Sequence, residues 1–219
     1  MPLIFHRNLR STGELGLWKI EEEEDFFMDK LTLLPLELDL INATKGHRKL
    51  EWLASRWLLH QMSGRDIRGA CLKNEFGKPY LENSFFEISI SHSRELVSVI
   101  AAPQAVGIDI QKLVNKIESI SHKFLREEEK ASLSKKNYLE HLHVYWGAKE
   151  ALFKAYGRKQ LDFKQHIFIK PFAFNLRVGK CYGYVQKEDY YADFELRYEQ
   201  IDDYILVYAI EIVEDERIA

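Results

Sequence analysis

The sequence has few cysteines, no long apolar run and no excess of positive charge. Its two cysteines, Cys71 and Cys181, lie far apart without metal-ligand spacing, which favours a reduced, cytoplasmic chain. No apolar stretch approaches the roughly 20 residues that cross a bilayer, and residues 1–18 lack the apolar core of a secretory signal. Because 31 Lys and Arg oppose 34 Asp and Glu, the net charge of −3 argues against a generally cationic nucleic-acid binder. We therefore expect a cytoplasmic protein with no nucleic-acid or membrane partner.

What is present is the composition of a globular protein, with 46% hydrophobic and 30% charged residues among 219. Such a chain can bury one sizeable core, or two small cores that pack against each other. The charge is uneven, because residues 20–41 hold eight acids and one lysine (−7), whereas residues 45–78 hold eight bases and three acids (+5). The basic segment could bind an anionic small ligand, or it could be an ordinary solvated helix face.

Hydrophobic spacing predicts helices in both halves of the chain, each followed by strands. Helices are expected over about 20–30, 43–62, 116–134 and 138–156. Three short strands are expected over 86–91, 96–101 and 106–110, and alternation predicts antiparallel strands from Phe168 onward. The fold class is therefore α+β, and with no Pro-, Gly- or Ser-rich linker the halves are expected to pack as one unit.

Three stretches could carry chemistry. The first is Gly107-Ile108-Asp109-Ile110-Gln111, where strand alternation places Asp109 and Gln111 on one side and the isoleucines on the other. A carboxylate at the end of an apolar strand needs a cation or hydrogen-bond donors as its partner. The alternative is a strand-end aspartate that caps a nearby backbone group.

The second stretch, residues 146–154, reads WGAKEALFK. On a helix, Trp146, Glu150 and Lys154 share one face, where a Glu–Lys pair is ordinarily a surface pair of about 0.3–0.5 kcal/mol.

The third stretch combines Gly77-Lys78-Pro79 with Ser91-His92-Ser93. A rigid turn that holds a lysine, together with hydroxyls and an imidazole between strands, is a plausible anion cradle. A lone turn histidine is more often a bystander.

The order GKP, SHS, GIDI and WxxKExxxK resembles the 4′-phosphopantetheinyl transferases, in particular the larger single-chain (Sfp-like) type that acts as an internal pseudo-dimer. The resemblance runs from His47-Arg48 to Lys154 and includes FLREEEKASL at 124–133. It implies two similar α+β subdomains, each a helix packed on an antiparallel sheet. Residues 1–105 would form the N-terminal subdomain with the coenzyme A phosphate contacts. Residues 106–219 would carry the metal ligands and the catalytic helix.

The resemblance implies Mg²⁺-dependent transfer of 4′-phosphopantetheine from coenzyme A, as co-substrate, to a serine of an apo acyl or peptidyl carrier protein. This is the holo-acyl-carrier-protein synthase type of reaction, and it releases adenosine 3′,5′-bisphosphate. In the family, Asp109 and Glu150 would bind the metal, Mg²⁺ or alternatively Mn²⁺, as suits hard oxygen ligands. Many relatives carry an acidic third ligand where this chain has Gln111.

The same resemblance assigns the remaining roles. Lys154 would stabilise the leaving group, and either Glu129 or Glu150 would take the serine proton, with Glu127 and Glu128 close to the first of these. The residues expected to contact coenzyme A are Arg56, Lys78, Pro79, Ser91, His92, Asp109 and Lys154.

A small acidic helical carrier protein is expected to dock near the site, with Phe124, Leu125 and the aromatics around Tyr145 as candidate contact residues. The protein is expected to be a monomer.

Two alternative functions stay open. One is a non-catalytic homologue that binds coenzyme A or a carrier protein, although Asp109, Glu150 and Lys154 are all present. The other is an unrelated α+β binding domain.

Overall fold

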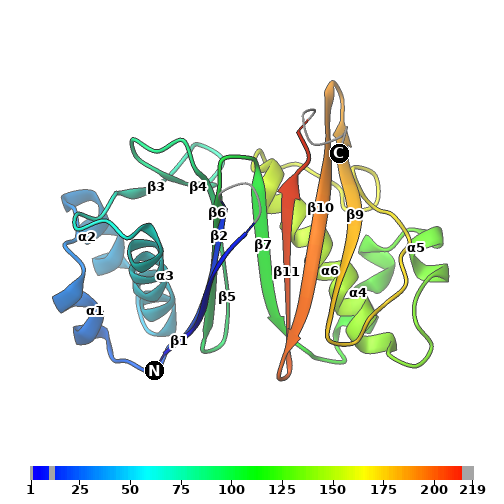
Figure 1. Ribbon diagram of the computed structural model, residues 1–219, viewed down its shortest axis with the longest axis horizontal. Helices are drawn as coiled ribbons and strands as arrows, with labels where there is room; N and C mark the ends of the chain where they lie inside the picture. The colour runs from blue at the N-terminus through cyan, green and yellow to red at the C-terminus, as the bar shows by residue number, and fades with distance from the viewer. Residues whose placement is uncertain (1, 10–12, 214–219) are drawn as a thin grey trace.

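The computed structural model describes residues 2–9 and 13–213. Within them the chain forms two antiparallel sheets with helices, which confirms the expected α+β class. Figure 1 shows the two sheets next to each other in the middle of the molecule, with α1–α3 on the outer side of one sheet and α4–α6 on the outer side of the other. The layers therefore follow the order helix, sheet, sheet, helix.

The first sheet has the strand order β1-β2-β6-β5-β4-β3. Its strands are β1 (Leu3–Asn8), β2 (Glu14–Lys19), β3 (Cys71–Lys73), β4 (Pro79–Leu81), β5 (Glu87–Ser93) and β6 (Leu96–Ala102). The helices beside it are α1 (Glu24–Lys30), α2 (Pro35–Ala43) and α3 (His47–Ser63). The predicted strands over 86–91 and 96–101 are β5 and β6, whereas the hairpin β1–β2 was not predicted.

The second sheet has the strand order β7-β11-β10-β9-β8. Its strands are β7 (Val106–Lys112), β8 (Ile167–Ile169), β9 (Val178–Lys187), β10 (Tyr190–Ile201) and β11 (Tyr204–Glu211). The helices are α4 (Ile117–Phe124), α5 (Glu127–Ala131) and α6 (Tyr138–Tyr156). The chain passes from one sheet to the other between Ala102 and Val106, and a division into subdomains at 105/106 stays a prediction.

Three apolar cores hold these layers together. One lies between the first sheet and its helices and contains the fully buried Phe27 and Leu58. Another lies between α6 and the second sheet and contains Leu152. The third lies between the two sheets and joins residues of both, among them Leu17 and Ile108. Because this third core is continuous across the sheets, it fixes one half of the molecule against the other.

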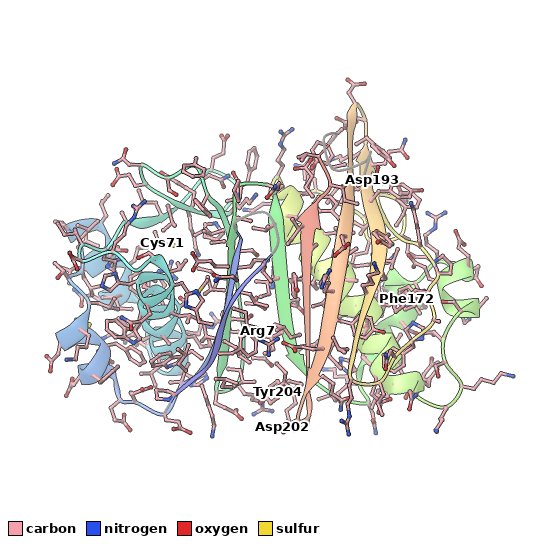
Figure 2. The ribbon with its side chains drawn as sticks, viewed as in Figure 1. Arg7, Cys71, Phe172, Asp193, Asp202 and Tyr204 are labelled. Atoms are coloured by element: carbon pink, nitrogen blue, oxygen red, sulfur yellow. The ribbon has the colours of Figure 1, made fainter. Side chains whose placement is uncertain are left out.

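The two halves are also linked at the surface. Arg7 of β1 donates from Nη1 to both carboxylate oxygens of Glu199 of β10, at 2.9 and 3.0 Å. Figure 2 shows Arg7 between the two sheets. An exposed pair of this kind contributes about 0–1 kcal/mol, so the apolar core between the sheets carries most of the association.

Helix α6 approaches β7 so closely that one position there requires glycine. A Cβ built on Gly107 would lie 1.8 Å from the carbonyl oxygen of Ala151. Any side chain at this position would therefore push α6 away from the strand. The close contact sets the helix that carries Glu150 and Lys154 directly against the strand that carries Asp109.

The single helix expected over 116–134 is two shorter helices. Leu125 is extended after α4, and Arg126 is the N-cap of α5, where the Glu129 carboxylate accepts the backbone N–H of Arg126 at 2.8 Å. This capping interaction ends one helix and starts the next, which apolar periodicity alone does not reveal.

Both cysteines are buried and free, Cys71 on β3 and Cys181 on β9, and Figure 2 labels Cys71 in the first half.

Of the helices in the described part of the chain, none combines the length and hydropathy of a transmembrane span.

Candidate functional site

The site begins with Asp109, which lies on β7 and is only 8% exposed. Its Oδ1 accepts a hydrogen bond from the Ser91 hydroxyl at 3.0 Å and one from the Lys154 ammonium at 2.8 Å. Ser91 comes from β5 of the first half, Asp109 from the first strand of the second half, and Lys154 from α6. The structure thus brings together three of the residues singled out from the sequence, and it does so at the boundary between the halves.

Lys154 is held in one position by three acceptors. Its Nζ donates to Asp109, to the Ser91 hydroxyl and to the Ile108 carbonyl, each at 2.8 Å. Three donors in an ammonium group match three acceptors, so the lysine is oriented before any ligand binds. The surface-pair alternative for this helix face is therefore wrong for Lys154.

Serine hydroxyls of β5 bind the free edge of β7. Ser89, Ser91 and Ser93 accept the backbone N–H groups of Ile108, Ile110 and Lys112 at 3.1, 3.2 and 3.3 Å. Side chains that alternate along one strand thereby satisfy the amides of another strand's edge. This arrangement fixes the position of Asp109, between the first two of these contacts, relative to the first half.

Glu150 lies one helical turn before Lys154 and carries a perturbed carboxyl group. Burial raises the pKa of Glu150 to about 7, the nearby Asp109 carboxylate adds to the rise, and Lys154 opposes it. Two carboxylates thus lie close enough to interact, with Lys154 as their cation. The hydrogen bonds of Asp109 described above use only Oδ1 and not Oδ2. The pair fits a hard cation with oxygen ligands.

Within residues 2–9 and 13–213, no group of three or more His, Cys, Asp and Glu could hold a metal ion. A divalent cation at Asp109 and Glu150 would therefore need further oxygen ligands, as Mg²⁺ commonly takes from water and from substrate phosphates. Gln111 is near, and its Nε2 donates to the His143 carbonyl of α6 at 3.1 Å. Its amide oxygen is the atom that remains for a cation.

A cavity of about 880 Å³ opens beside this cluster, between α3, β5 and the C-terminal end of α6. Its volume is in the range of small-molecule and cofactor sites. Lys154 lines the cavity and so connects it with Asp109. The cationic side chains among the lining residues are Arg48, Arg56, Lys73, Lys78, Lys154 and Lys159. Glu51 is the one carboxylate among the lining residues in the described part of the chain, so the cavity attracts anions.

Arg56 is the most deeply buried of these cations, with 5% exposure. Its Nη1 donates to the Ser55 hydroxyl at 2.9 Å and its guanidinium lies 4.2 Å from the Trp52 ring centroid, while its Nε has no partner within the described residues. Burial lowers the pKa of Arg56. A buried guanidinium with a spare donor at a cavity wall is suited to an anion.

Lys78 follows Gly77, whose φ of +85° suits the tight turn. Its Nζ donates to the Ala155 carbonyl at 3.0 Å and to Glu87 at 2.7 Å, which joins the turn to the end of α6. Pro79 and His92 also line the cavity. Lys78, Pro79 and His92 of the two motifs therefore line one cavity, whereas Ser91 and Ser93 bind the edge of β7, and the role of this wall as an anion cradle stays a prediction.

Glu129 does not join the site. Its side chain is 0% exposed and forms an ion pair with the fully buried Lys149 at 2.8 Å. It also accepts the backbone N–H groups of Arg126 at 2.8 Å and Ile169 at 3.0 Å. A carboxylate enclosed in this way has no access to a substrate, so we assign Glu129 a structural role.

The aromatics expected to face a carrier protein are also not at the surface. Phe124, Leu125 and Tyr145 are 1%, 4% and 0% exposed and belong to the core between α6 and the second sheet. Their apolar character reflects packing, and the expected docking surface is wrong for these three residues.

Sequence reasoning did not single out Arg48, Lys73, Lys159 or Glu51. Arg48 and Arg56 are eight residues apart on one helix, which places them on the same face, and this spacing could have paired them. Glu51 was missed because its partner at 3.0 Å, His92, comes from β5, far along the chain.

Two comparisons with known proteins show what this chain is similar to. Residues 105–209 match the family described as the 4′-phosphopantetheinyl transferase superfamily. The chain is also 30% identical over 125 residues to the 4′-phosphopantetheinyl transferase gsp of Aneurinibacillus migulanus, which covers 54% of this chain and 52% of that protein. The aligned part thus spans about half the length of this relative.

The match to the 4′-phosphopantetheinyl transferase superfamily thus covers slightly less than half of the chain. The matched segment contains Asp109, Gln111, Glu150 and Lys154, whereas the cavity wall from α3 and β5 lies outside it.

Proposed function

We propose that the protein transfers 4′-phosphopantetheine from coenzyme A to a serine of an apo carrier protein. The observation that carries the proposal is the position of Lys154. Its side chain lines the basic cavity and binds Asp109 at 2.8 Å, so one cation joins an anion-binding space to a carboxylate pair. Transfer of a phosphoryl group with a pyrophosphate oxygen as leaving atom needs positioned cations of this kind.

In the proposed reaction, the serine hydroxyl attacks the phosphorus that bears pantetheine. The bond from this phosphorus to the bridging pyrophosphate oxygen breaks, and adenosine 3′,5′-bisphosphate leaves with that oxygen and the electron pair. Lys154 stabilises the charge on the leaving oxygen. A Mg²⁺ ion held by Asp109 and Glu150, with the amide oxygen of Gln111 as a third ligand, would neutralise the pyrophosphate and polarise the phosphorus.

The serine proton needs an acceptor close to the cavity. Glu129 is enclosed in the core, which leaves Glu150 as the side chain that we propose for this step, either directly or through a water. Ser91 already donates to Asp109 and accepts from Lys154, so we propose that it orients this pair.

Coenzyme A itself would occupy the cavity of about 880 Å³. We propose that Arg56, Lys78 and His92 bind its phosphates and that Pro79 contacts it. A cytoplasmic location, a monomeric state and an acidic carrier protein as partner stay predictions.

Mass spectrometry of a panel of apo carrier proteins, incubated with the protein, coenzyme A and Mg²⁺, tests the proposal. We expect a mass gain of one phosphopantetheine on at least one carrier, and no gain with Asp109→Asn or Glu150→Gln. Glu195→Gln, which removes a surface partner of Arg197, is the matched control and should leave transfer unchanged.

Thermal unfolding separates loss of the site from loss of the fold. We expect the Asp109 and Glu150 variants to keep cooperative unfolding, and coenzyme A with Mg²⁺ to stabilise the wild type. Stabilisation by coenzyme A without transfer to any carrier would favour a non-catalytic binding homologue instead. Near-normal turnover of both variants would exclude the metal assignment.

A further inference from the structure

The basic cavity contains one carboxylate whose presence conflicts with an anionic ligand. Glu51 of α3 is 8% exposed and lines the cavity among six cationic side chains. A buried carboxylate there repels any phosphate that enters, because electrostatic interactions are strong at a partly desolvated wall. A local conflict of this kind is often found where a residue has a role in function.

Glu51 has two imidazoles as its neighbours. Its Oε1 lies 3.0 Å from Nδ1 of His92 and 3.5 Å from Nε2 of His47. The His47 ring nitrogen also lies 2.6 Å from the Arg94 carbonyl, so His47 already has a close backbone partner. Of the two histidines, His92 lines the cavity.

The 3.0 Å contact is an ion-pair distance between the Glu51 carboxylate and one ring nitrogen of His92. Because a carboxylate only accepts, a proton on Nδ1 suits this contact, and Nε2 is then the nitrogen left for a ligand. The same logic applies where a carboxylate orients a histidine that binds a metal or moves a proton.

We propose that Glu51 is a positioning residue that holds the Nδ1–H of His92 and thereby directs Nε2 to a phosphate group of the ligand in the cavity. The identity of that ligand as coenzyme A rests on the proposed function. The Glu51 carboxylate repels the phosphate directly, but it also orients the histidine that binds the phosphate. On this proposal its net effect is to strengthen ligand binding, whereas simple repulsion would weaken it.

Steady-state kinetics with coenzyme A as the varied substrate test the proposal in the full-length protein. Glu51→Gln keeps an oxygen acceptor of the same shape without the charge. We expect it to raise the KM for coenzyme A about five-fold, the difference between a charge-assisted and a neutral hydrogen bond, with kcat within about two-fold. In a His92→Ala background, Glu51→Gln should raise KM no further, because its effect passes through His92.

The matched control is Glu14→Gln. Glu14 Oε2 lies 2.6 Å from His6 Nε2 on the β1–β2 hairpin, so this variant breaks a comparable Glu–His pair that does not line the basic cavity. Its KM for coenzyme A should equal that of the wild type. A lower KM in Glu51→Gln would show that Glu51 only repels the ligand, and an equal increase with and without His92 would show a role that does not involve the histidine. Either result overturns the proposal.

Nitrogen-15 NMR of the His92 ring gives a readout that does not depend on turnover. We expect an Nδ1–H signal in the wild type, its loss in Glu51→Ala, and a shift of Nε2 on titration with inorganic pyrophosphate. An Nε2–H tautomer in the wild type, or an unaffected Nε2, would refute the proposal. If wild type modifies no carrier protein, the proposed function fails, and the pyrophosphate titration still decides the role of Glu51.

Discussion

The buried pair of Glu129 and Lys149 allows a sharp test of the assignment of Glu129 to the core. Both side chains are 0% exposed. Burial lowers the pKa of Lys149, and the Glu129 carboxylate opposes that shift. The ammonium donates to Glu129 at 2.8 Å and to the carbonyls of Phe163 and Ile167 at 2.9 and 3.0 Å, so each of its protons has an acceptor.

Lys149→Met removes one partner and leaves the other charge in the core. The loss of one member of a buried ion pair costs about 3–5 kcal/mol, because the remaining ion is uncompensated. Glu129 keeps two backbone donors, Arg126 N–H and Ile169 N–H, so we expect a value near the middle, about 4 kcal/mol. For a chain of this size that is a fall in Tm of about 8–16 °C.

Urea denaturation of the wild type, Lys149→Met, Glu129→Gln and the double variant measures the free energy of unfolding. Replacing both members removes both charges, so no unpaired ion stays in the core. The loss of unfolding free energy in the double variant should therefore be smaller than the sum of the two single losses by about 2 kcal/mol. A cost below about 1 kcal/mol for Lys149→Met would refute the buried-pair argument.

The same variants separate a structural from a catalytic Glu129. If the residue only supports the fold, Glu129→Gln keeps a kcat within about two-fold per folded molecule, measured below its Tm. A loss of kcat by about 100-fold with an unchanged free energy of unfolding would identify Glu129 as the base after all.

Two further predictions concern the packing of α6. Gly107→Ala places a Cβ about where the Ala151 carbonyl lies, so it should lower the free energy of unfolding, measured by urea denaturation, by about 3 kcal/mol or more. The control Gly69→Ala adds a Cβ with no atom within 4 Å and should be nearly neutral. Equal costs for the two variants would contradict the close approach of α6 to β7. Burial lowers the pKa of His141 from 6.5 to about 4, so between these pH values the unfolded chain takes up a proton that the folded chain does not. Stability should therefore fall by up to about 3 kcal/mol as the pH drops through this range, and His141→Phe should remove that part of the pH dependence; an unchanged slope would refute the assignment.

Elements with strong periodicity could be predicted from the sequence. The helix expected over 138–156 is α6 (Tyr138–Tyr156), and the strand expected over 106–110 lies within β7. The hairpin β1–β2 escaped prediction for opposite reasons in its two strands. β1 is mostly exposed on both faces, and β2 is a continuous buried run in its middle, so neither shows the alternation of a half-buried strand.

The site could be predicted where a motif lies on one element and not where it depends on contacts between elements. Asp109 and Lys154 were identified from their own stretches, and the structure joins them at 2.8 Å. Glu129 and Tyr145 were misplaced because a sequence cannot distinguish a buried glutamate or tyrosine from an exposed one. Glu51 was missed because its partner His92 is on a strand 41 residues away.

The position of the site at the boundary between the halves has a physical reason. The Ser91 hydroxyl donates one hydrogen bond, to Asp109, and accepts two, from Ile110 N–H and Lys154. A hydroxyl has one donor and two acceptor positions, so its capacity is fully used. Two of its partners belong to the first strand of the second half and the third belongs to α6, so the orientation of Lys154 depends on contact between the sheets. The apolar core between them therefore holds the geometry on which the proposed chemistry depends.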